Sequence, residues 1–101
     1  MTRQNYLARL QTAIKATHGL DSRHVESVPI TETFEGKTVW DGIVEVYALL
    51  GHATARQCYA WAYDTPEGSR VIAVLGVPPI TSPQMAVKAA CVAEMKEAAQ
   101  N

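Results

Sequence analysis

Residues 57–63 have the sequence QCYAWAY, in which small and aromatic side chains alternate strictly from Cys58 onward. Successive side chains of a β-strand point to opposite faces of the sheet, so this stretch is predicted to be a strand. One of its faces carries three aromatic rings, and the other carries a cysteine and two alanines. Because small side chains let a helix approach closely, we expect helices to cover the small-residue face.

Other segments show periodicities of their own. Apolar residues recur three and four positions apart over residues 2–18, which predicts an amphipathic helix between the N-cap Thr2 and Gly19. Ser82 followed by Pro83 predicts the start of an alanine-rich helix that extends to about residue 99. Between these helices, side-chain alternation or Val- and Ile-rich composition predicts strands at residues 25–34, 39–50, 57–63 and 70–77.

The order of these elements predicts an α+β fold in a single domain of residues 1–101. We expect a two-layer sandwich, in which an antiparallel sheet of three to four strands has an N-terminal and a C-terminal helix packed on one face. Pro29 lacks a backbone N–H, so the strand at residues 25–34 should lie at a sheet edge. Trp40, Val44 and Val46 are expected on the covered face.

Composition and charge limit the possible functions. The chain has 101 residues, of which 48% are hydrophobic, and its formal net charge is −1. This suits one globular domain with its own core, and no basic stripe of the kind that binds phosphates is visible. Cys58 and Cys91 are predicted to be buried free thiols. Without a leader or a membrane-spanning run, we expect a cytoplasmic protein that makes no membrane contact.

The order α-β-β-β-α, with the first edge strand set aside, resembles that of the double-stranded RNA-binding domain. Gly51-His52 lies in the loop where that family also places a histidine, and residues 82–90 are similar to its serine-led second helix. The resemblance implies RNA binding. The positions that match the family's lysine cluster are Pro83, Gln84 and Val87, none of which is basic. The chain also looks like small bacterial proteins of unknown function, a similarity that implies no activity.

The aromatic face is the first candidate site. Tyr59, Trp61 and Tyr63, with Tyr47 and Ile43 on the neighbouring strand, are expected on the outer side of the sheet. Three interpretations of these residues remain open, namely a core beneath the helices, an interface with a second copy or a protein partner, and a platform for a ligand. We favour a non-catalytic interaction module that forms a homodimer or binds a protein through this face.

His52 is the second candidate. It could act with Glu45 or Asp41 in a small-ligand site or an enzyme active site beside the aromatic rings. Ligand spacing for zinc, a phosphate-binding glycine loop and a dinucleotide motif are missing from the sequence, so we expect no metal and no cofactor. RNA binding and small-ligand binding therefore stand as alternatives to the interaction module.

Overall fold

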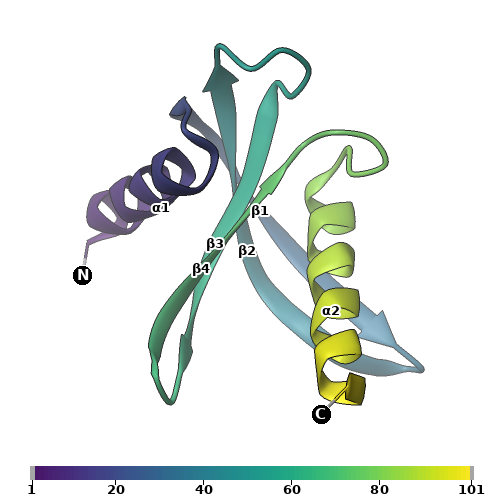
Figure 1. Cartoon of the computed structure of the whole chain (residues 1–101). Coiled ribbons are helices and arrows are strands. Elements are labelled where there is room, and N and C mark those ends of the chain that lie inside the picture. Colours follow the sequence, from purple (N-terminus) through teal and green to yellow (C-terminus); the bar gives the residue numbers. More distant parts are fainter. Residues whose placement is uncertain (1, 101) are drawn as a thin grey trace.

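A computed structural model describes residues 2–100 of the chain, with side chains through residue 96. Its elements are α1 (Arg3–His18), β1 (Asp21–Phe34), β2 (Lys37–Leu50), β3 (Gln57–Thr65), β4 (Gly68–Leu75) and α2 (Pro83–Gln100) (Figure 1). The strands form one antiparallel sheet in the order β1-β2-β3-β4, and both helices contact it. The predicted α+β class is confirmed, and β1 begins earlier than expected.

The helix ends follow the predicted local signals. The Thr2 Oγ1 accepts a hydrogen bond of 3.1 Å from the backbone N–H of Asn5, and Gly19 ends α1 in a left-handed conformation with φ 70°. The backbone N–H of Gly19 donates to the carbonyl of Lys15. At the start of α2 the backbone N–H of Met85 donates to the Ser82 Oγ at 3.2 Å. These contacts satisfy end groups that a helix leaves without partners.

The two helices cover opposite faces of the sheet, which corrects the expectation that both pack on one face. Leu10 of α1 lies in a buried cluster with Cys58, whereas Val87 of α2 lies in a second buried cluster with Tyr59. Cys58 and Tyr59 are consecutive in β3, so their side chains point to opposite sides. Figure 1 shows α1 and α2 on either side of the twisted sheet. Both faces of β3 are apolar, and each is covered by its own helix.

The register between β2 and β3 also differs from the expected grouping. Tyr47 pairs with Cys58 and Val46 pairs with Tyr59. Directly opposed residues of an antiparallel pair share a face, so Tyr47 lies on the side covered by α1. Val46 lies on the aromatic side, which α2 covers. Side chains alternate along a strand, so a shift of one residue in the register moves every side chain to the other face. The observed register therefore places Tyr47 and Val46 on the faces opposite to those expected.

The sheet consists of two long hairpins that meet along a short seam. β1 pairs with β2 along nearly its full length, and β3 pairs with β4 from Cys58 to Thr65. By contrast, β2 and β3 pair only from Glu45–Ala60 to Ala48–Gln57. Beyond the Glu45–Ala60 pair the two hairpins diverge, as Figure 1 shows. Residues 37–44 of β2 and 61–65 of β3 therefore flank a gap in the sheet.

The burial of Cys58 predicts a loss of stability at alkaline pH. Its side chain is fully buried, and this burial raises the pKa of the thiol from an ordinary value of 9.0 to about 12. The unfolded chain therefore loses this proton first as the pH rises. The contribution is fully present below about pH 9 and falls by about 1.4 kcal/mol per pH unit between the two pKa values.

Urea unfolding of the wild type and of Cys58→Ala tests this expectation. Between about pH 8 and about pH 10.5 the wild type should lose about 2 kcal/mol more unfolding free energy than the variant. Equal losses in the two proteins would show that the Cys58 thiol is not protected from ionisation by the fold.

Candidate functional site

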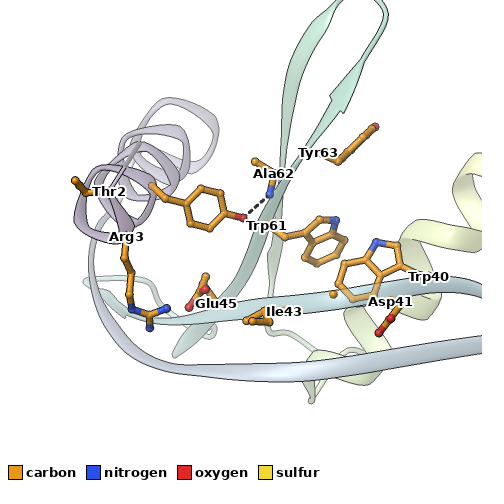
Figure 2. A pocket seen from close by; sticks show the side chains of 11 residues that line it. Thr2, Arg3, Trp40, Asp41, Ile43, Glu45, Trp61, Ala62 and Tyr63 are labelled. Carbon is orange, nitrogen blue, oxygen red and sulfur yellow. Dashed lines mark hydrogen bonds between the residues drawn. The ribbon is translucent and has the colours of Figure 1, made fainter.

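A cleft opens where the two hairpins diverge. It has a volume of about 680 Å³ and is lined by residues 40–43 and Glu45 of β2, residues 61–63 of β3 and the N-terminal part of α1 with its cap residue Thr2 (Figure 2). Small-molecule sites in proteins usually occupy 300–1,000 Å³ and combine apolar walls with a few polar groups. The cleft has that size and that mixture of side chains.

Two tryptophans form one wall of the cleft. The rings of Trp40 in β2 and Trp61 in β3 meet edge to face, with centroids 5.5 Å apart and planes at 67°. Tyr63 lies farther along β3 on the same side of the strand. Figure 2 shows both indoles near one another in the space between the diverging strands. Edge-to-face packing is a favoured geometry for aromatic rings, and it holds this wall in place.

A polar network lies at the end of the cleft near α1. The Arg3 Nη2 donates to the Ser27 Oγ at 2.6 Å, and the Ser27 hydroxyl donates in turn to the Glu45 Oε1. The His24 Nε2 donates to the same Glu45 Oε1 at 2.9 Å. Glu45 is only 2% exposed. A buried carboxylate is costly unless it receives hydrogen bonds, and these two donors supply them.

Tyr6 connects α1 to β3 beside the cleft. Its hydroxyl accepts a hydrogen bond of 3.0 Å from the backbone N–H of Ala62, drawn as a dashed line in Figure 2. Ala62 lies just past the end of the seam, so its N–H has no carbonyl of β2 to bind. The tyrosine hydroxyl takes the place of that carbonyl. This contact positions the first turns of α1 over one end of the cleft.

The structure divides the predicted aromatic surface into two parts. Ile43, Trp61 and Tyr63 line the cleft, whereas Tyr47 and Tyr59 do not. The Tyr47 hydroxyl instead donates to the carbonyl of Leu7 in α1 at 2.7 Å. The exposure expected for the aromatic rings is wrong at three positions. Tyr47 is fully buried, Tyr59 is 2% exposed and Trp61 is 3% exposed.

His52 lies outside the cleft and organises its own loop. Its Nδ1 accepts hydrogen bonds from the backbone N–H groups of Thr54 and Ala55, at 3.1 and 2.8 Å. Within the described residues it makes no hydrogen bond to Glu45 or Asp41, so the expected pairing is not found. Both carboxylates do line the cleft, and Glu45 is paired with His24 instead.

Several residues of the site were not predicted from the sequence. Arg3, Tyr6 and Trp40 line the cleft, and His24 and Ser27 hold its buried carboxylate. The pairing of β1 with β2 places Ser27 opposite Glu45 and His24 opposite Tyr47. The sequence carried one usable signal, because a glutamate between two valines in an apolar stretch of strand, as at residues 44–46, predicts a polar partner on the neighbouring strand.

Further observations on the described residues concern metal ligands, membrane-spanning helices and the cysteines. Among residues 2–96, whose side chains the structure describes, no group of three or more His, Cys, Asp or Glu side chains is placed to hold a metal ion. Neither helix, within residues 2–100, is both long enough and apolar enough to cross a membrane. Both cysteines are free, Cys58 buried and Cys91 partly so. Comparisons of the chain with protein-family models, curated proteins and solved structures found no match.

Proposed function

We propose that this protein is a non-catalytic binding module that holds a small organic ligand with an aromatic body in the cleft between its two hairpins. The observation that carries the proposal is the early end of β2–β3 pairing at Glu45–Ala60. It separates two strands that would otherwise close against one another. The opening of about 680 Å³ is supported by the aromatic wall of Trp40, Trp61 and Tyr63.

The side chains of the cleft favour binding over catalysis. The two donors that bind Glu45, the His24 ring and the Ser27 hydroxyl, both reach the same carboxylate oxygen, Oε1. A nucleophile with its own general base, as covalent catalysis requires, does not occur among the cleft-lining residues that the structure describes. Aromatic edges and faces beside a few polar groups are instead the usual composition of a ligand pocket.

Intrinsic tryptophan fluorescence and amide NMR shifts test this proposal. The chain contains two tryptophans, and both line the cleft, so their emission reports on it directly. In a screen of small aromatic compounds by ligand-observed NMR, hits should shift the indole signals of Trp40 and Trp61. Trp40→Ala should weaken a hit by about three- to tenfold, because one aromatic contact is lost.

The matched control is Phe34→Ala, which removes an exposed ring from the same hairpin outside the cleft. This variant should bind each hit as the wild type does. Hits that leave both indole signals unchanged, or that bind Trp40→Ala as tightly as the wild type, would overturn the proposal.

RNA binding and self-association remain predictions with less support. Among the positions that match the lysine cluster of RNA-binding domains, Val87 is buried, and the Gln84 amide donates to the Glu32 carboxylate. The nearby Lys88 Nζ lies 3.7 Å from the same carboxylate of Glu32. Self-association through the predicted aromatic face would need Tyr47 and Tyr59 on one surface, but both are buried and they lie on opposite faces of the sheet.

A further inference from the structure

The polar end of the cleft presents two opposite charges whose hydrogen-bonding capacity is only partly used. Glu45 accepts both of its hydrogen bonds on Oε1, and no hydrogen bond from the described residues reaches its Oε2. Arg3 donates through Nη2 to Ser27, which leaves most of its five N–H donors available. Arg3 is exposed and Glu45 is buried, yet both line the cleft.

These two charged groups are held next to one another without forming an ion pair. The Ser27 hydroxyl stands between them, because it accepts from Arg3 and donates to Glu45. Figure 2 shows the guanidinium and the carboxylate at the same end of the cleft, away from the indole of Trp40. The cleft therefore has the N–H donors of the Arg3 guanidinium and the acceptor Oε2 of Glu45 at one end, and aromatic rings at the other.

We infer that the ligand is a zwitterion with an aromatic body, of the class of free aromatic α-amino acids, an inference that rests on the proposed function. The ligand's ammonium donates to the Glu45 Oε2, and its carboxylate accepts from the Arg3 guanidinium, whose planar fork matches a carboxylate. Its ring lies against Trp40 and Trp61. A ligand with only one of these charges leaves either Arg3 or Glu45 without its counterpart.

Three probes with the same phenyl ring separate the contributions of the two charges. They are L-phenylalanine, phenethylammonium, which lacks the carboxylate, and 3-phenylpropionate, which lacks the ammonium. Binding is followed by tryptophan emission and by the indole NMR signals of Trp40 and Trp61. L-Phenylalanine should bind at least about tenfold more tightly than either singly charged probe, since each charge-assisted hydrogen bond strengthens binding.

Variants of the charged residues give a second, independent readout. Arg3→Gln should reduce the affinity for L-phenylalanine to about that for phenethylammonium, and it leaves the buried core intact because Arg3 is exposed. Glu45→Gln should do the same relative to 3-phenylpropionate. The matched control is Arg9→Gln, which alters an α1 arginine that binds Ser69 outside the cleft and should not change binding.

The outcomes distinguish this inference from the proposed function. If a singly charged probe shifts the indole signals with an affinity equal to that of L-phenylalanine, the inference fails and the proposed function stands. If Arg3→Gln and Arg9→Gln bind L-phenylalanine alike, the inference also fails. If none of the three probes shifts either indole, the ligand is not of this class, and the screen of aromatic compounds decides the proposed function separately.

Discussion

Replacing Trp61 by alanine is expected to lower the free energy of unfolding by about 3–5 kcal/mol, the range for large-to-small substitutions of buried aromatic residues. Trp61 is 3% exposed and lies in the cluster that packs β3 against α2. Its removal leaves a cavity in the buried cluster to which Val87 also belongs, and it takes away the edge contact with Trp40. Urea unfolding followed by circular dichroism measures the loss.

The same experiment tests where this aromatic face lies. Phe34→Ala is the comparison, because Phe34 is 54% exposed at the end of β1, and its loss should cost less than about 1 kcal/mol. If the rings of β3 were on an open surface, Trp61→Ala would cost as little as Phe34→Ala. Similar small losses in both variants would show that α2 does not cover this face.

Ile14→Ala and Val87→Ala are expected to destabilise the protein independently of one another. Each side chain is fully buried, Ile14 on the inner face of α1 and Val87 on the inner face of α2. The expected losses are about 2–5 kcal/mol for Ile14→Ala and roughly 1.5–3 kcal/mol for Val87→Ala. The two clusters share no residue and lie on opposite faces, so the loss in the double variant should equal the sum within about 0.5 kcal/mol.

A second double-mutant cycle, with both substitutions in one cluster, is the control for this additivity. Leu10 and Ile14 are one turn apart on α1 and belong to the same buried cluster. Leu10→Ala combined with Ile14→Ala should therefore deviate from the sum by more than about 0.5 kcal/mol. A deviation above about 1 kcal/mol for Ile14→Ala with Val87→Ala would mean that the two helices share a core, as expected for packing on one face.

Parts of the candidate site could be predicted from the sequence. Ile43, Trp61 and Tyr63 were expected to face a binding surface, and all three line the cleft. The carboxylates of Asp41 and Glu45 were expected beside those aromatic residues, where they are found. These residues lie on the strands that flank the gap, so strand assignment was enough to bring them to the cleft. The expectation that Ile43 shares a face with Trp61 was wrong, because Ile43 alternates with Tyr47 on the side that α1 covers.

The partners of Glu45 could not be predicted in the same way. His24 lies outside the strand predicted at residues 25–34, and its contact with Glu45 depends on the register between β1 and β2. Arg3 and Tyr6 reach the cleft only because α1 crosses the sheet at the end of the seam. Such contacts join residues that are far apart in the chain, and no local periodicity encodes them.

The helices, the strands and the α+β class follow from local patterns in the sequence. The caps at Thr2 and Ser82 and the alternation at residues 57–63 act through neighbouring residues, so they can be recognised without the fold. Which face each helix covers depends on packing between distant segments, because both faces of β3 are apolar and either could be buried. The point where β2 and β3 separate is likewise a property of the whole sheet, since the end of their pairing at Glu45–Ala60 depends on its twist and register.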